Sequence, residues 1–202
     1  MSIKATSDLH FGHDNIIRYC KRPCTTENHI DYLISILNEA IGIDDVVYHL
    51  GDFSYQKKLS VKELHYILTR LNGTWYFILG NHDDENRLRA MCQNTKHKVL
   101  SDYHTVRYKD RTFVLFHYPI ERWWNDHRGS IHLHGHIHNH PMRKLPNRHN
   151  VCFDREVNYP VLKDVASRTV CRSVFFDTSS VVQARDFPLT RLTLPPCPVS
   201  DK

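Results

Sequence analysis

Five short apolar segments of this chain are each followed by polar residues of the types that bind metal ions, and this pattern constrains the fold most. The segments cover residues 3–7, 45–50, 74–79, 111–116 and 131–134, and their length and β-branched or aromatic content are typical of strands. In open α/β sheets, ligands bind outside the carboxyl ends of the strands. We therefore expect the polar clusters to meet at one edge, and they are Asp8 and His10, Asp52, Asn81 to Asp83, His117, and His136 and His138.

Apolar residues at helical spacing predict helices between the first strands. They indicate a helix over residues 28–41 and a second over 60–71, where Ser60 and Glu63 have the spacing of a capping box. A short helix is expected over residues 83–90. The second half predicts strands over residues 99–108, 111–116, 131–134, 150–153 and 172–176, with one short helix over 160–169.

This order of elements predicts an α/β (α+β) fold in which two sheets form a β-sandwich flanked by helices. We expect one domain over residues 1–176. Residues 177–202 contain Pro188, Pro195, Pro196 and Pro198, and predict an irregular C-terminal extension.

Composition limits the cellular setting and the partners. No apolar run approaches the roughly 20 residues needed to span a bilayer, and the N-terminus lacks a secretory signal, so we expect a soluble, cytoplasmic protein. Six scattered cysteines predict reduced thiols, and Cys20 and Cys24 lack the second close pair of a zinc site. The net charge of +5 is compatible with anionic partners but does not establish nucleic-acid binding.

The polar clusters contain imidazole, carboxylate and amide groups and no cysteine. Such a set suits borderline-to-hard divalent ions such as Mn, Fe, Zn or Co. These side chains are more than one tetrahedral ion needs, and they fit two ions about 3.5–4 Å apart that share a carboxylate. A pair of ions lowers the pKa of a bridging water and stabilises charge on phosphoryl oxygens, which indicates hydrolysis of a phosphate ester.

The segments SDLHFGHDNI, GDF, GNHD, HYP and HLHGHIH occur in this order. Together they resemble the calcineurin-like metallophosphoesterase superfamily, especially its small, single-domain bacterial and phage-type members. The resemblance covers residues 1 to about 165. It implies the metallophosphoesterase fold and two divalent metal ions per chain, with Mn favoured and Fe, Zn, Ni, Co or Mg as alternatives.

The resemblance also implies a role for each matching residue. The first ion would be held by Asp8, His10 and His138, the second by Asn81, His117 and His136, and Asp52 would bridge the two. His82 would contact the phosphate and protonate the leaving oxygen, and Asp83 would orient His82. Many members carry a further Asp where this chain has Tyr55, which implies a different pocket shape rather than a lost metal ion.

Other residues are candidates for substrate contact, each with an ordinary structural alternative. The candidates are His13, Asn15 and Arg18 after the first motif, and Trp123 and Trp124, which would stack on an aromatic group or form a packed lid. His132 and His134 alternate with apolar residues and are expected to pack or to support ligands. The basic loop with Arg143, Lys144 and Arg148 is either solvated or a track for a nucleic-acid backbone.

We therefore predict a dinuclear phosphoesterase in which a metal-bridging hydroxide attacks phosphorus and His82 acts as general acid. The mild positive charge and the tryptophans favour phosphodiesters of nucleotides, cyclic nucleotides or nucleic-acid ends. The alternatives are a phosphomonoesterase, a catalytically silent scaffold of the same fold, and a nucleic-acid-binding protein. The sequence does not indicate the oligomeric state.

Overall fold

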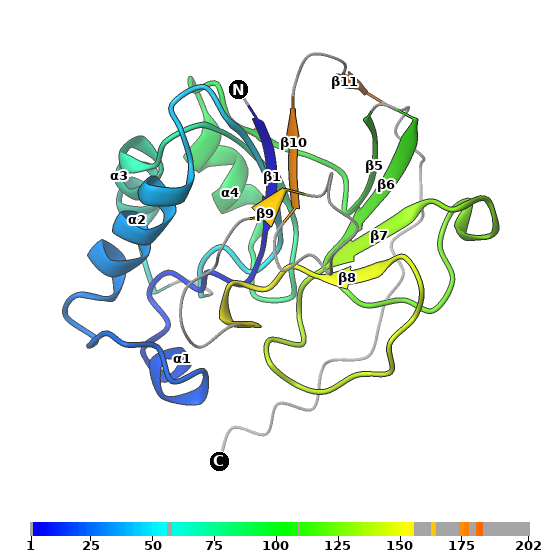
Figure 1. Ribbon diagram of the computed structural model, residues 1–202. Coiled ribbons are helices and arrows are strands. Elements are labelled where there is room, and N and C mark those ends of the chain that lie inside the picture. The colour runs from blue at the N-terminus through cyan, green and yellow to red at the C-terminus, as the bar shows by residue number, and fades with distance from the viewer. Residues whose placement is uncertain are drawn as a thin grey trace.

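The structure is a computed structural model that describes residues 2–55, 58–108 and 110–155, together with the backbone of three later strands. Within this part, a six-stranded sheet has the order β4-β3-β2-β1-β10-β9 and a five-stranded sheet has the order β11-β5-β6-β7-β8 (Figure 1). The first sheet comprises β1 (Ser2–Thr6), β2 (Val46–Leu50), β3 (Thr74–Ile78), β4 (Lys98–Val99), β9 (Lys163–Asp164) and β10 (Val174–Asp177). The second comprises β5 (Tyr103–Tyr108), β6 (Arg111–Phe116), β7 (Ile131–His134), β8 (Arg148–Asn150) and β11 (Val181–Gln183).

The helices are α1 (Asp14–Tyr19), α2 (His29–Ala40), α3 (Val61–Arg70) and α4 (Glu85–Cys92), with short 3₁₀ turns η1 (Asp126–Arg128) and η2 (Phe153–Arg155). Figure 1 shows α2, α3 and α4 on the side of the first sheet that faces away from the second sheet. Two packed sheets with helices outside confirm the predicted fold class.

The direction of the strands brings the carboxyl ends of several strands to one edge. β1, β2, β3 and β4 pair in parallel in the first sheet, and β6, β7 and β8 pair in parallel in the second. The loops that follow β1, β2, β3, β6 and β7 carry the polar clusters identified in the sequence.

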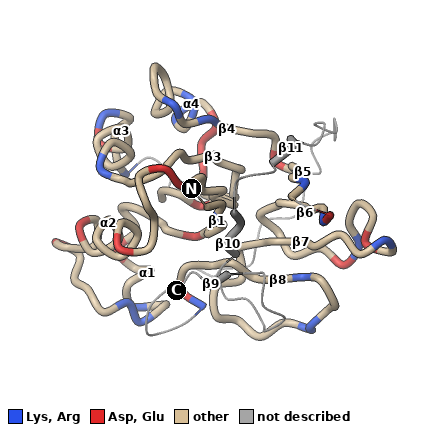
Figure 2. Tube along the Cα trace, turned by 45° about the horizontal axis from the view of Figure 1, so that its top comes forward, with Lys and Arg blue, Asp and Glu red and all other residues tan. Residues whose placement is uncertain are grey.

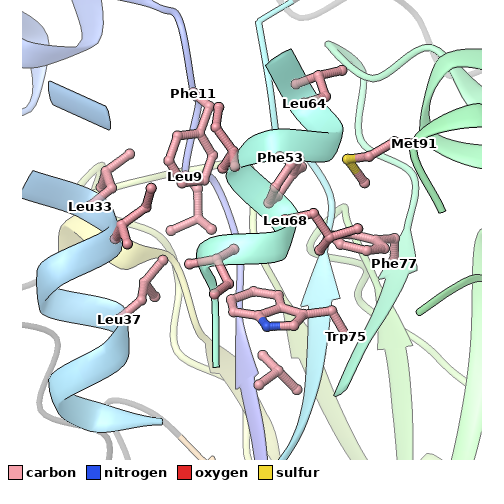
Figure 3. Packing of buried hydrophobic residues seen from close by; sticks show 14 of the residues in the cluster. Leu9, Phe11, Leu33, Leu37, Phe53, Leu64, Leu68, Trp75, Phe77 and Met91 are labelled. Atoms are coloured by element: carbon pink, nitrogen blue, oxygen red, sulfur yellow. The ribbon is translucent and has the colours of Figure 1, made fainter. Parts of the chain in front are cut away.

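Successive side chains of a strand point to opposite faces of the sheet, and this divides the core into two layers. Tyr76 and Ile78 of β3 pack between the sheets, while Trp75 and Phe77 of the same strand face the helices. The helix-side layer is the larger cluster of buried residues. Figure 3 shows part of it, with Leu9, Phe11, Leu33, Leu37, Phe53, Leu64, Leu68, Trp75, Phe77 and Met91 labelled.

The capping box predicted from Ser60 and Glu63 is present at the start of α3. The backbone N–H of Glu63 donates to Ser60 Oγ at 3.2 Å, and the N–H of Ser60 donates to Glu63 Oε2 at 2.6 Å. The predicted bounds of α2, β2, β3, β6 and β7 agree with the observed elements to within a residue or two.

Several predicted elements differ from the structure. The strand predicted over residues 99–108 is two strands, because the chain leaves β4 in the first sheet and enters β5 in the second. The strand predicted over residues 150–153 ends at Asn150, where Asn150 Oδ1 accepts the N–H of Cys152 at 2.8 Å and the chain turns into η2.

Two predictions fall mainly outside the described residues. The helix predicted over 160–169 is wrong at Lys163–Asp164, which form β9, and its other residues lie outside the described part. The region past residue 176 is not wholly irregular, because Val181–Gln183 pairs antiparallel with β5. The domain boundary itself remains a prediction. Among the described residues, no helix has both the length and the apolar character needed to cross a lipid bilayer.

Candidate metal centre

The loops that hold the candidate ligands have an unusual backbone. Asp8, His10, Asp52, His136 and His138 all have φ between 45° and 72°, in the left-handed region that residues with a side chain rarely adopt. Each such residue costs on the order of 1 kcal/mol or more, and such residues cluster at functional sites. The N–H of Asp8 donates to the carbonyl of Gly51 at 2.9 Å, so the loops after β1 and β2 brace one another.

The first group of candidate ligands consists of Asp8, His10 and His138. His10 Nε2 lies 3.3 Å from His138 Nε2 and 3.9 Å from Asp8 Oδ1, and His138 Nε2 lies 3.7 Å from Asp8 Oδ1. Residues 8 and 138 come from different sheets, so this group forms where the two sheets meet.

The second group consists of Asn81, His117 and His136. Asn81 Oδ1 lies 3.0 Å from His117 Nε2 and 2.9 Å from His136 Nδ1, and these two nitrogens are 3.2 Å apart. His117 is fully buried, whereas Asn81 is exposed. The second group therefore opens to solvent on the side of Asn81.

Asp52 lies between the two groups. Its Oδ2 is 3.6 Å from His10 Nε2 in the first group and 3.6 Å from His117 Nε2 in the second. Its Oδ1 accepts the backbone N–H of His82 at 2.9 Å, which leaves Oδ2 directed at both groups. This geometry is the one expected of a bridging carboxylate.

Hydrogen bonds identify which imidazole nitrogens lack a proton. His117 Nδ1 lies 2.8 Å from the carbonyl of Leu50, which only accepts, so Nδ1 carries the proton and Nε2 has a free lone pair. That lone pair faces Asn81 Oδ1 and a nitrogen of His136. Burial lowers the pKa of His117, and it lowers the pKa of His136 to about 4, so both rings are neutral near pH 7.

His117 Nε2 and Asn81 Oδ1 present lone pairs to each other at 3.0 Å, and a cation between them would remove their repulsion. In the first group, burial lowers the pKa of His10 although Asp8 opposes this effect. The burial of His138 is instead outweighed by Asp154 and Cys20, which raise its pKa to about 11, so a metal ion would displace a proton from His138. The donor set therefore fits divalent ions, and two groups joined by one carboxylate fit a pair of ions.

Glycines make room for the two carboxylates. A Cβ on Gly135 would lie 2.4 Å from Asp8 Oδ2, and a Cβ on Gly80 would lie 2.1 Å from Asp52 Oδ1. The glycines before Asn81 and His136 therefore permit a close approach that no other residue would allow.

Asp83 binds the backbone of the loop that carries Asp52. Its Oδ2 accepts the backbone N–H groups of Asp52 at 2.7 Å and Gly80 at 3.0 Å, and its Oδ1 accepts those of Phe53 and Ser54. A carboxylate has about four acceptor positions, and these bonds use them. Asp83 thus holds the loop of Asp52 in place, and its role in orienting His82 remains a prediction.

His82 lies at the edge of the centre and is half-buried. Its ring centroid is 5.3 Å from that of His10 and 5.3 Å from that of Tyr55. His13 packs on Tyr55 with centroids 3.9 Å apart, and burial lowers the pKa of His13 to about 4. His82, Tyr55 and His13 therefore form an aromatic wall next to the first group.

The other substrate candidates do not all reach this wall. Asn15 and Arg18 are exposed on α1, with the Arg18 guanidinium 5.4 Å from the Tyr19 ring centroid. Trp123 donates its Nε1–H to the carbonyl of Ser130 and packs on His132, which favours the packed-lid alternative. Trp124 is 38% exposed. Substrate contact by Asn15, Arg18 and Trp124 remains a prediction.

His132 and His134 are buried and bond to backbone carbonyls, as expected of packing residues.

Three residues behind the first group were missed: Arg22, Asp154 and Cys152. The Cys152 thiol donates to Asp8 Oδ2 at 2.9 Å, and Asp154 contacts His138. Cys20 also lies near His138, and no signal in the sequence connects residues this far apart.

Comparisons with known proteins found one matching family and several similar proteins. The model of the family described as calcineurin-like phosphoesterase matches residues 1–172. An uncharacterized protein of Methanocaldococcus jannaschii is 33% identical over 141 residues, which cover 69% of this chain and 71% of the relative. The gene 66 protein of Mycobacterium phage L5 is 28% identical over 200 residues, which cover 85% and 91%. A solved structure of a protein of unknown function from Aquifex aeolicus matches with a TM-score of 0.57 and 22% identity over 76% of this chain and 91% of that one, which supports the fold.

Proposed function

The chain belongs to the calcineurin-like phosphoesterase family of metal-dependent hydrolases, and we propose that it cleaves phosphodiesters with two divalent ions, Mn favoured. The substrates proposed are nucleotides, cyclic nucleotides or nucleic-acid ends. The observation that carries this proposal is the position of Asp52 Oδ2, 3.6 Å from a ligand nitrogen of each group.

When bound, a pair of divalent ions would supply an ionised water near neutral pH and neutralise charge on the phosphoryl oxygens. Asp8, His10 and His138 would hold one ion, Asn81, His117 and His136 the other, and Asp52 both. The chain contributes the fixed spacing of these ligands, because Asp83 and the glycines leave the loops little freedom.

His82 is proposed to protonate the leaving oxygen. Its backbone N–H is fixed by Asp52 Oδ1, so its position relative to the bridging carboxylate is set by one hydrogen bond. Its half-buried ring lies beside His10 and Tyr55, where it would meet the ester group that leaves. General acids of this kind contribute about 10²–10⁴-fold to the rate.

The preference for diesters over monoesters rests on the aromatic wall rather than on charge. A monoester carries more negative charge than a diester, and only a diester has a second ester group that neutral side chains can contact. Figure 2 shows Lys and Arg on α1, α3, α4 and the loop between β7 and β8, with Asp and Glu interspersed. The net charge of +5 supports an anionic substrate, and the aromatic wall supports a leaving group with a flat ring.

The test compares hydrolysis of a model diester and the matching monoester by the Mn-loaded protein. We expect faster diester hydrolysis, loss of activity with a chelator, and recovery when Mn is added back. His82→Ala should lower turnover about 10²–10⁴-fold with both ions still bound, whereas His127→Ala, whose side chain is 64% exposed, should have no effect. Faster monoester hydrolysis would instead support a phosphatase, and loss of metal in His82→Ala would refute its assigned role.

A further inference from the structure

Asp154 lies behind the first group of ligands. Its Oδ2 is 3.0 Å from His138 Nδ1, and its side chain is 2% exposed. Since an ionised carboxylate only accepts hydrogen bonds, Nδ1 of His138 must carry a proton. An imidazole that binds a metal ion is neutral, so in the metal-bound state the lone pair of His138 is on Nε2, the atom that faces His10 and Asp8. Asp154 thus determines which nitrogen of His138 is available to an ion.

Arg22 holds Asp154 in place. Its Nε donates to Asp154 Oδ1 at 2.7 Å and its Nη2 donates to Oδ2 at 2.7 Å, so the guanidinium grips both carboxylate oxygens. The remaining three N–H groups meet the carbonyl of Asp8, the carbonyl of Leu9 and His29 Nε2, at 2.7–2.9 Å. All five N–H donors of Arg22 therefore have partners. A lysine at this position could not replace them, because its ammonium group lacks the planar, two-pronged arrangement of donors.

The same guanidinium also fixes the loop after β1. The carbonyls of Asp8 and Leu9 that it binds belong to the stretch in which Asp8 and His10 have left-handed backbone conformations. Arg22 and Asp154 therefore act together on every ligand of the first group: on Asp8 and His10 through the loop, and on His138 through its ring.

The second group lacks this support among the described residues. His117 Nδ1 bonds to the neutral carbonyl of Leu50 at 2.8 Å, and His136 presents Nδ1 itself to Asn81 and His117. A carboxylate behind an imidazole increases its basicity and its affinity for metal more than a carbonyl does, so the two groups are chemically unequal.

We propose that Arg22 and Asp154 are a positioning pair that makes the Asp8, His10 and His138 position the tighter of the two ion sites, so that this position fills first. This inference rests on the proposed two-ion function, but it concerns affinity and not hydrolysis. An ordinary buried ion pair for comparison is Lys4 and Asp45, which joins β1 to the residue before β2 with a 2.8 Å contact.

The test is a titration with Mn²⁺ in which the EPR signal of the free ion gives the number and affinity of the bound ions. We expect the wild type to bind two ions of unequal affinity. Asp154→Asn should weaken the tighter one about 10–100-fold and leave the weaker one within about threefold. Asp45→Asn removes a buried carboxylate at a distance from the ligands, so it should leave both affinities unchanged.

Two further variants assign the effect to one position. Asn81→Ala leaves the first group intact, so adding Asp154→Asn should weaken the ion that remains. His10→Ala disrupts the first group, so adding Asp154→Asn should change the remaining affinity little. Should Asp154→Asn fail to fold, Arg22→Lys, which keeps the charge but not the two-pronged grip, should weaken the same ion.

Equal weakening of both ions, or no weakening of either, would overturn the inference even if the wild type hydrolyses diesters. Conversely, a wild type that binds two ions unequally, responds to Asp154→Asn and hydrolyses no ester would refute the proposed function alone. The titration therefore tests the inference and the ester assay tests the proposed function, and either claim can be refuted without the other.

Discussion

Gly135→Ala tests how closely the two sheets must approach at the metal centre. A Cβ on Gly135 would lie 2.4 Å from Asp8 Oδ2, about 1 Å inside the 3.4 Å lower limit of ordinary contact, and 2.5 Å from Ser7 Oγ. The φ of Gly135 is outside the left-handed region, so alanine meets no backbone strain there and the effect is steric. Asp8 or the loop of residue 135 must move by roughly 1 Å to accept the methyl group.

That displacement is large for a metal ligand. Ligand distances vary by about ±0.2 Å, so a 1 Å shift removes Asp8 from an ion that His10 and His138 still hold. It also disturbs the hydrogen bonds that Asp8 Oδ2 accepts from the Cys152 thiol and from the N–H of His136. We expect the variant to lose about 1–3 kcal/mol of unfolding free energy and at least about tenfold in affinity for the first ion.

The assay combines urea unfolding of the metal-free protein with a Mn²⁺ titration. Gly129→Ala is the control, because a Cβ there meets no atom within 4 Å but a φ of 83° costs alanine about 1–2 kcal/mol. It should lose comparable stability and keep both ions. If Gly135→Ala binds two Mn²⁺ ions with wild-type affinity, Asp8 does not need its observed position and the assignment of the first group is wrong.

Three other perturbations have defined outcomes. Leu68→Ala, which empties a position 1% exposed in the helix-side core, should lower the unfolding free energy by about 2–5 kcal/mol in urea titrations. Ser60→Ala should cost about 1 kcal/mol in the same assay by removing the capping box, and no loss would mean that the cap does not stabilise α3. Although burial raises the pKa of Asp45, hydrogen bonds from Lys4 and from backbone N–H groups lower it overall, so its stabilisation is present above about pH 4 and lost below. The difference in stability between wild type and Asp45→Asn should accordingly be constant at pH 5–7 and shrink at pH 3.

The sequence predicted most of the fold because its local signals agree with its tertiary structure. Short apolar runs became β1, β2, β3, β6 and β7, and the Ser60 capping box marked the start of α3 within a residue. The polar clusters at strand ends predicted one shared edge, since parallel strands bring their carboxyl ends together. The split between β4 and β5 was missed, because an apolar run does not reveal which of two sheets each half joins.

The buried pair behind the ligands, Arg22 and Asp154, could not be predicted from the sequence for a related reason. Arg22 and Asp154 are 132 residues apart, and each looks like an ordinary surface residue in its local sequence. Only the folded chain shows that they are buried and bonded to each other. Asp83 illustrates the same limit, because nothing in the sequence indicates that its oxygens bind the backbone of a loop some 30 residues earlier.

The seven candidate ligands are spread from residue 8 to residue 138, with four before or within the loop after β3 and three delivered by the second sheet. During translation, a nascent chain that has left the ribosome only as far as residue 116 would carry Asp8, His10, Asp52 and Asn81 and none of the later imidazoles. The proposed second ion position needs His136 and the proposed first position needs His138, so both are completed only after the end of β7 has emerged and the sheets have packed together. A chain could therefore bind both ions only late in its synthesis, after the last ligand has been added.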